Sequence, residues 1–235
     1  MSKGDGIVFP YRWEPRIYQI PAWNAISMGC RRLALFWHRR AGKDLWGINR
    51  MATSMQKRHG LYWHAFPQLK MGKRIAWNGM TNDGRKFRSA FPDWDRAGER
   101  GAFLKSSNNN EMYLETKEGD VYQIIGTEDP DALRGPNPVF IDWSEFAYMD
   151  GDTCRGITDP ILAANEGIEV INTTPNGKNH AWRLYQLALK DQFDHKTNPN
   201  GWFVQRLTID DTKTLLIGTG CRSSRGISGM VSIYV

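Results

Sequence analysis

The sequence has few of the features that define membrane proteins, secreted proteins and zinc clusters. Its three cysteines, Cys30, Cys154 and Cys221, lie far apart and form no CxxC pair, which argues against a disulfide framework and a zinc site. No apolar run approaches the roughly 18 residues that a membrane-spanning helix needs. The opening stretch MSKGDGIVFP lacks the apolar core of a secretory signal. We therefore expect a protein of a reducing compartment, the cytosol, with no membrane segment.

The sequence also contains no internal repeat and no low-complexity tract. Its 235 residues, 40% of them hydrophobic and 24% charged, suit one globular α/β domain or two small ones. The net charge of +6 is unevenly distributed: residues 1–110 hold 20 Lys and Arg against 7 Asp and Glu, whereas residues 111–235 hold 11 against 18. This division predicts one face that binds anions and one that carries carboxylates. Two solvated surfaces of opposite sign are the alternative.

Short apolar segments alternate with helical patterns along the chain. Most are continuous apolar runs, as expected for strands that are buried on both faces of a parallel sheet. The predicted strands are 32–37, 61–66, 121–125, 139–143 and 168–172, with 112–115 and 121–125 forming a hairpin. The predicted helices are 43–58, 67–80 and 180–190. Residues 81–110 show no clear pattern. This alternation predicts an α/β fold with a mostly parallel sheet flanked by helices.

The first predicted strand continues into a basic loop that ends in Gly-Lys and opens the first predicted helix. The loop and helix start comprise His38, Arg39, Arg40, Ala41, Gly42, Lys43 and Asp44. A strand, a tight loop and a helix N-terminus bind nucleotide phosphates, because unpaired backbone N–H groups attract the anion. Trp37 replaces the first glycine of the usual motif, and Asp44 replaces its Ser/Thr, although a carboxylate oxygen also suits Mg²⁺. A basic turn that opens an amphipathic helix is the alternative.

A later buried strand ends in acidic and hydroxyl groups, at Asp142, Ser144 and Glu145. Phosphate-loop ATPases need such a strand, because it supplies a group that holds the metal and a carboxylate that orients the attacking water. In one register Ser144 replaces the usual aspartate, and in the other Asp142 helps to bind the metal. Glu145 is the catalytic candidate in both registers. The magnesium candidates are therefore Asp44, Asp142 and Ser144, and an ordinary acidic strand end is the alternative.

The order of these motifs resembles the ATPase domain of the large terminase subunit of tailed bacteriophages, over residues 9–211. Residues 11–19 resemble the adenine-side segment of that family, and residues 38–44 resemble its arginine-rich deviant phosphate loop. Residues 126–135 resemble its Leu-Arg-Gly segment, which precedes the acidic strand. Residues 171–177 resemble its coupling motif. The resemblance implies a P-loop NTPase fold of the ASCE, RecA-like type.

The resemblance also implies a role for the residues that match the motifs. Lys43 would bind the β- and γ-phosphates of ATP, with Arg39 or Arg40 assisting. The other residues of the loop, 38–44, would surround the same phosphates. Glu145 would activate the attacking water, and Gln19 would recognise adenine.

Two further motif positions would link the nucleotide to the rest of the motor. Thr173 and Thr174 would couple loss of the γ-phosphate to movement. Arg134 would contact phosphate or DNA. The alternative for Arg134 is an ion pair with a nearby acid: Glu128, Asp129 or Asp131.

The resemblance divides the chain into a terminase-type ATPase domain, 1–211, and a tail, 212–235. Family members that package DNA also carry a C-terminal nuclease domain of the ribonuclease-H type, and nothing after residue 211 resembles it. The tail contains no Asp or Glu. We hypothesise that the tail is non-family sequence, produced by a frameshift, a programmed shift or a gene interruption, and we expect no nuclease activity.

The implied function is an ATP-hydrolysing motor that uses Mg²⁺ and moves double-stranded DNA into a procapsid in the host-cell cytoplasm. The implied partners are the small terminase subunit, the portal protein and further copies of the chain in a ring. One alternative is another nucleic-acid-stimulated P-loop ATPase, such as a helicase-like translocase, although a helicase would need a second motor domain. The other is a truncated remnant that binds nucleotide or DNA without turnover.

Overall fold

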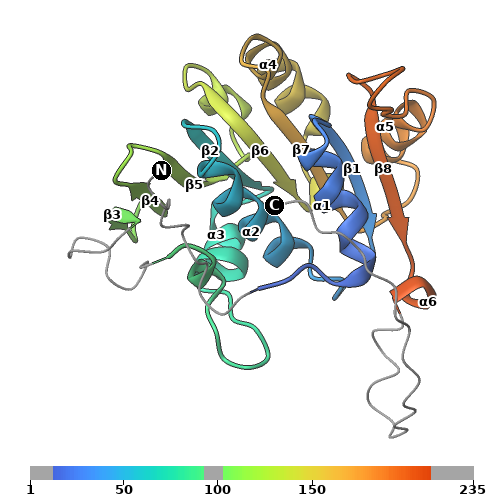
Figure 1. The fold of residues 1–235 in the computed structure, drawn as a ribbon. Helices are drawn as coiled ribbons and strands as arrows, with labels where there is room; N and C mark the ends of the chain where they lie inside the picture. Colours follow the sequence, from blue (N-terminus) through green and yellow to red (C-terminus); the bar gives the residue numbers. More distant parts are fainter. Residues whose placement is uncertain (1–12, 93–102, 213–235) are drawn as a thin grey trace, which may run out of the picture.

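An eight-stranded sheet forms the centre of the computed structural model, which describes residues 13–92 and 103–212. The strand order is β3-β4-β5-β2-β6-β7-β1-β8 (Figure 1). The strands are β1 (Arg32–Trp37), β2 (Leu61–Phe66), β3 (Leu104–Asn108), β4 (Tyr113–Thr116), β5 (Val121–Gly126), β6 (Pro138–Ser144), β7 (Ile168–Thr173) and β8 (Trp202–Leu207). The six strands from β5 to β8 in this order are parallel, and β4 and β3 continue the sheet antiparallel. The predicted α/β class with a mostly parallel sheet is confirmed.

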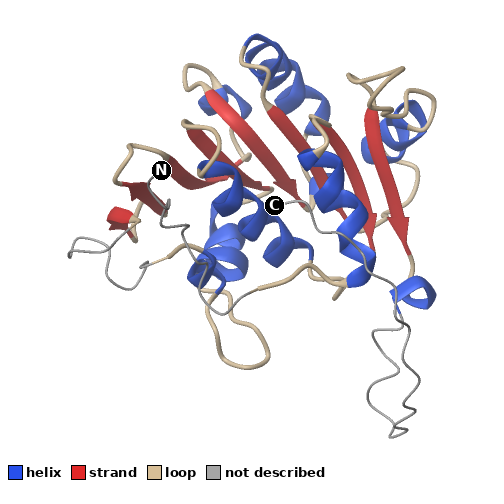
Figure 2. Ribbon diagram, viewed as in Figure 1, coloured by secondary structure: helices blue, strands red, loops and turns tan. Residues whose placement is uncertain are grey.

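Helices cover both faces of this sheet (Figure 2). They are α1 (Ile20–Ser27), α2 (Lys43–Met55), α3 (Leu69–Gly72), α4 (Gly151–Ala164), α5 (His180–Ala188) and α6 (Ile209–Thr212). The side chains of α1 and α2 join one hydrophobic cluster, in which Trp46 is fully buried. Those of α4 and α5 join a second cluster with Leu162 and Leu184. Each strand alternates between the two clusters, so its apolar run is buried on both sides.

The predicted strands and the hairpin of β4 with β5 are confirmed within one or two residues. The long helix predicted over 67–80 is wrong. The structure has the short α3 and then a π-helical turn, Lys73–Trp77, because Gly72 lies where an added Cβ would come within 2.8 Å of the side chains of Phe66 and Ile124. In the unassigned stretch 81–110, the structure forms a 3₁₀ turn, Phe87–Ala90, and β3.

The parallel strands bring the ends of β1, β6 and β7 to one edge of the sheet. Phe36 of β1 is level with Thr173 of β7, and Ser144 of β6 is level with Asn172 of β7. The loops that follow these three strands therefore meet, as ligand-binding loops do at the carboxyl edge of open α/β sheets. Within the residues that the structure describes, no helix is long and apolar enough to span a membrane. Most of the predicted tail, residues 213–235, lies outside the described residues.

Helix α2 approaches β6 so closely that its Gly47 has no room for a side chain. An added Cβ would lie 1.9 Å from Oδ2 of Asp142, which is fully buried. We expect Gly47→Ala to lower the free energy of unfolding by about 1–3 kcal/mol, as overpacking usually does. The matched control is Gly156→Ala in α4, where the added Cβ meets nothing within 4 Å. This control should gain up to about 1 kcal/mol from helix propensity. Urea unfolding of both variants measures the difference, and equal changes would contradict the close approach.

Candidate nucleotide site

The loop between β1 and α2 has the backbone shape of a phosphate-binding loop. Arg40 (φ 69°) and Gly42 (φ 80°) adopt left-handed conformations, and Gly42 caps the N-terminus of α2. The first N–H groups of a helix have no intrahelical acceptor, and the helix dipole places partial positive charge there. The loop thus presents N–H donors to an anion although Trp37 replaces the usual first glycine. Trp37 instead packs edge-on against Trp46 of α2.

Lys43 is the centre of the site. Its side chain is only 6% exposed, and its ammonium donates a hydrogen bond to Oγ1 of Thr174 (2.8 Å) and pairs with Oε1 of Glu145 (3.5 Å). The three residues come from the start of α2, the end of β6 and the end of β7. The structure therefore brings together the loop lysine, the acidic strand end and one residue of the predicted coupling motif.

Glu145 sits in a strained turn that directs its carboxylate toward Lys43. Its φ of 57° is left-handed, which is uncommon for a residue with a side chain and typical of functional sites. The turn continues as the 3₁₀ segment Phe146–Tyr148. Two side chains at the start of α5 hold this segment: His180 contacts the carbonyl of Phe146 (Nε2–O 2.9 Å), and Asn179 donates to the carbonyl of Ala147 (3.2 Å).

The two threonines of the predicted coupling motif contact different parts of the site. Thr174 accepts the hydrogen bond from Lys43. Thr173 is fully buried, and its Oγ1 accepts a hydrogen bond from the backbone N–H of Ala147 (3.1 Å), two residues beyond Glu145. The end of β7 is thus attached both to the lysine and to the turn that carries the candidate catalytic carboxylate.

Asp44 and Ser144 form a direct hydrogen bond, from the serine hydroxyl to Oδ1 of the aspartate. In the usual phosphate-loop site, a hydroxyl stands at the loop position and a carboxylate at the strand position. Here the two groups are exchanged, and the pair still consists of one hydroxyl and one carboxylate. Such oxygen donors are the ligands that Mg²⁺ prefers, with water and phosphate completing its shell. This pair fits a magnesium ion and answers the question of register left open by the sequence.

Asp142 lies deeper than this pair. It is fully buried on the α2 face of β6, and within the described residues neither carboxylate oxygen has a hydrogen-bond partner. Burial raises the pKa of Asp142 well above its usual range, and the charge of Asp44 adds to this rise. A buried carboxyl group of this kind is a poor match for a primary metal ligand. Its role as a ligand stays a prediction.

Gln19 supports the phosphate loop from behind. It is 2% exposed, its Nε2 donates to the carbonyl of Ala41 (2.8 Å), and its Oε1 accepts from the backbone N–H of Arg16 (2.9 Å). Tyr18 adds a bond from its hydroxyl to the same Ala41 carbonyl (3.3 Å). Both ends of the Gln19 amide are therefore engaged within the protein, and recognition of adenine by Gln19 stays a prediction.

The remaining predicted residues lie around the loop or away from it. Arg39 and Arg40 are exposed, and the ring of His38 contacts Oγ1 of Thr212 (2.7 Å). Arg134 is exposed and pairs with Asp131 (2.8 Å), the ion pair considered as its alternative. A contact of Arg134 with phosphate or DNA stays a prediction. Sequence reasoning missed Asn179 and His180, whose only local signal was their place at the start of a predicted helix.

The fold and the site can now be compared with those of known proteins. Searches of family models and of curated proteins gave no match to the sequence. Among solved structures, a variant of the large-terminase ATPase domain of Thermus phage P74-26 is similar with a TM-score of 0.63 and 14% identity, covering 86% of this chain and 84% of that one. The large terminase of a thermophilic bacteriophage gives 0.59 and 15%, covering 86% of this chain and 48% of that one. The same terminase in complex with ADP gives 0.58 and 13%, covering 84% and 46%.

These similarities define the class of protein: the chain has the P-loop NTPase-like fold of phage large-terminase ATPase domains. The resemblance inferred from the motifs is thus confirmed at the level of the fold. This chain spans about half the length of the thermophilic-phage terminase and most of the Thermus phage ATPase domain.

A buried histidine next to the site makes stability depend on pH. His64 of β2 is fully buried with its Nδ1 2.9 Å from the hydroxyl of Tyr122, and burial lowers its pKa from 6.5 to about 3. The unfolded chain binds a proton near pH 6.5, whereas the folded chain does not until about pH 3. Stability from this group is therefore present above pH 6.5 and lost as the pH falls between these values.

We expect the free energy of unfolding to fall by about 1.4 kcal/mol per pH unit from this residue alone. His64→Gln replaces the ring with a neutral amide and should remove that slope. Urea unfolding of the parent and of the variant between neutral and acidic pH isolates the contribution, because all other groups cancel in the difference. Parallel pH profiles would contradict a neutral buried histidine.

Proposed function

We propose that the chain is the ATP-hydrolysing motor domain of a phage DNA-packaging terminase. The contact of Lys43 with Glu145 and Thr174 supports this most directly, because it joins the three motifs that such a motor needs. The terminase neighbours support nucleotide binding, since one of them was solved with ADP and another with ATP-γ-S.

ATP would bind with its phosphates at the N-terminus of α2, where the loop N–H groups and Lys43 supply positive charge. Lys43 would then exchange Glu145 for a phosphate oxygen. This exchange frees the Glu145 carboxylate, which orients a water molecule toward the γ-phosphorus. The oxygen of the water bonds to phosphorus, the bond to the leaving ADP oxygen breaks, and Glu145 accepts the water proton before it passes to the phosphate.

Asp44 and Ser144 are the residues that would hold Mg²⁺. The ion supplies positive charge to the phosphate oxygens when it is bound. The exchanged pair leaves one carboxylate in the site, as in the usual arrangement. Asp142 lies below the pair and keeps α2 and β6 close at Gly47.

Loss of the γ-phosphate would reach the rest of the protein through Thr174. When the phosphate leaves, Lys43 returns to Glu145 and Thr174, and the loop after β7 follows. Double-stranded DNA, the small terminase subunit, the portal protein and a ring of further copies are the partners that we propose for this motor, in the host-cell cytoplasm.

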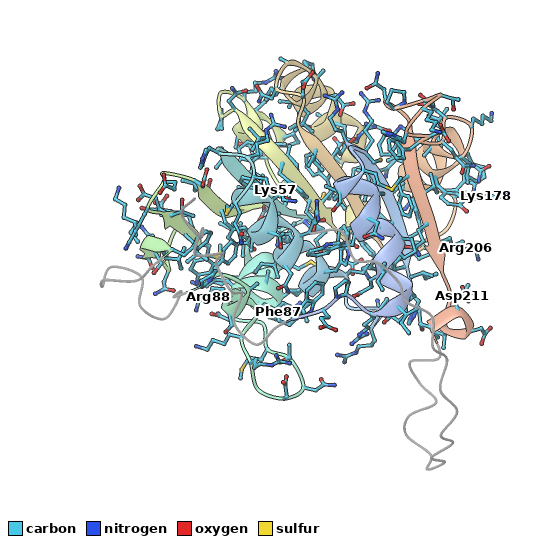
Figure 3. The ribbon with its side chains drawn as sticks, in the orientation of Figure 1. Lys57, Phe87, Arg88, Lys178, Arg206 and Asp211 are labelled. Carbon is cyan, nitrogen blue, oxygen red and sulfur yellow. The ribbon has the colours of Figure 1, made fainter. Side chains whose placement is uncertain are left out.

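Lys43→Ala tests the core of the proposal. It removes the ammonium that would bind the β- and γ-phosphates, so we expect the ATP hydrolysis rate to fall by roughly 100-fold or more, in line with the loss of a key electrostatic contact. The control is Lys57→Ala, which removes an equal charge from an exposed position after the end of α2 (Figure 3). Phosphate release from purified proteins measures both. Equal rates in the parent and in Lys43→Ala would contradict the proposal.

The exchange of the hydroxyl and the carboxylate gives a second test. Asp44→Ser and Ser144→Asp, made singly, leave the pair with two hydroxyls or two carboxylates, and we expect each to weaken Mg²⁺-dependent binding of a fluorescent ATP analogue about tenfold or more. The double variant restores one of each in the usual order and should recover most of the affinity. A double variant as weak as the singles would rule out a shared metal site, and a chelator control separates Mg²⁺-dependent binding from the rest.

A further inference from the structure

A groove of about 290 Å³ lies next to the coupling motif, on the sheet face that α5 covers. Its walls come from the ends of β1 and β8, the loop 175–177 and the first turns of α5. Phe36 and Tyr185 pack edge to face at 4.9 Å and form an aromatic surface inside it. Trp182 of α5 is 39% exposed at the same groove.

The groove is positively charged. None of the residues that line it is acidic, and Arg206 of β8 supplies a guanidinium. The ammonium of Lys178 stands 5.6 Å from the ring centre of Trp182. The carboxylate that interacts with Arg206, that of Asp211, already accepts hydrogen bonds from the backbone N–H and hydroxyl of Thr208 (2.7 Å each). Figure 3 shows Lys178 and Arg206 on the β8 side of the molecule.

Two cations beside exposed aromatic and amide groups suit a sugar-phosphate backbone, which offers anionic oxygens and apolar sugar faces. The volume is near the lower limit of roughly 300 Å³ for small-ligand pockets. It therefore accommodates a short piece of backbone and leaves the base edges unread.

The groove is connected to the nucleotide site at both ends of its loop. At the start of the loop, Thr174 accepts the hydrogen bond from Lys43. At its end, Asn179 and His180 contact the carbonyls of the segment that follows Glu145. A movement of Lys43 or of the Glu145 turn therefore acts directly on one wall of the groove.

We propose that this groove binds the backbone of double-stranded DNA, and that the loop 175–178 transmits the nucleotide state to the bound strand. The second half of this inference rests on the proposed motor function, whereas the binding of DNA does not. Lys178 and Arg206 contact phosphates, and Trp182 packs against the sugar.

The test is the binding of a fluorescent DNA duplex to the full chain over a series of NaCl concentrations. We expect Lys178→Ala/Arg206→Ala to weaken binding about tenfold and to reduce the slope of log K against log [NaCl] by about 1.8, from two lost phosphate contacts. Trp182→Ala should weaken binding without changing the slope. The control, Lys57→Ala/Arg183→Ala, removes the same charge from exposed positions that do not line the groove, Arg183 being paired with Asp152. Melting temperatures check that all variants fold.

Equal affinity and slope in the groove and control variants would overturn the proposal. So would a change in sedimentation without a change in DNA affinity, because the groove would then bind a second copy of the chain. If the parent binds DNA through the groove but hydrolyses no ATP, the proposed motor function fails and the DNA groove stands. If the parent hydrolyses ATP and the groove variants bind DNA normally, the groove fails and the ATPase stands.

Discussion

The burial of the Lys43 ammonium is the constraint on which the rest of the site depends. A charge that is nearly removed from water needs an opposite charge and a hydrogen-bond acceptor beside it. Glu145 and Thr174 supply these, and they come from two different strands. They reach the lysine because β7 and β6 follow β1 directly in the sheet. The strand order, the left-handed Gly42 and the strained Glu145 all serve to place three groups at one point.

This arrangement is also a switch in physical terms. Glu145 and a bound phosphate would compete for the same ammonium, so the carboxylate is held when the phosphate is absent and released when it is present. The segment after Glu145 is bonded to Thr173 and to the start of α5, and Thr174 is bonded to Lys43. The loop between Thr174 and α5 is thus held at both ends by groups that respond to the nucleotide, and the groove that we assign to DNA lies beside it.

Much of the sheet was predictable because its strands are short apolar runs with polar ends, and a buried strand needs no other signal. Helix α4 was not predicted, since its Gly151, Gly156 and Pro160 all disfavour a helix and its position is fixed by packing on the sheet. Strand β8 was missed for a related reason: its burial varies from residue to residue, and its pairing with β1 joins segments far apart in the sequence.

The site shows the same division between local and long-range information. The loop lysine, the acidic strand end and the two threonines were found from the sequence because each lies in a short motif. The hydrogen bond between Asp44 and Ser144 and the contacts of His180 join residues far apart in the chain, so no local pattern revealed them. Gln19 was assigned to adenine by resemblance, whereas the structure shows its amide holding the phosphate loop.

The most direct test of this account is a crystal structure of the chain with a non-hydrolysable ATP analogue and Mg²⁺. The account predicts that the γ-phosphate lies at the N-terminus of α2 with Lys43 bound to it and no longer to Glu145. It also predicts that the metal lies between Asp44 and Ser144, with Asp142 outside its coordination shell. An analogue bound elsewhere, with the Lys43–Glu145 pair intact, would contradict it.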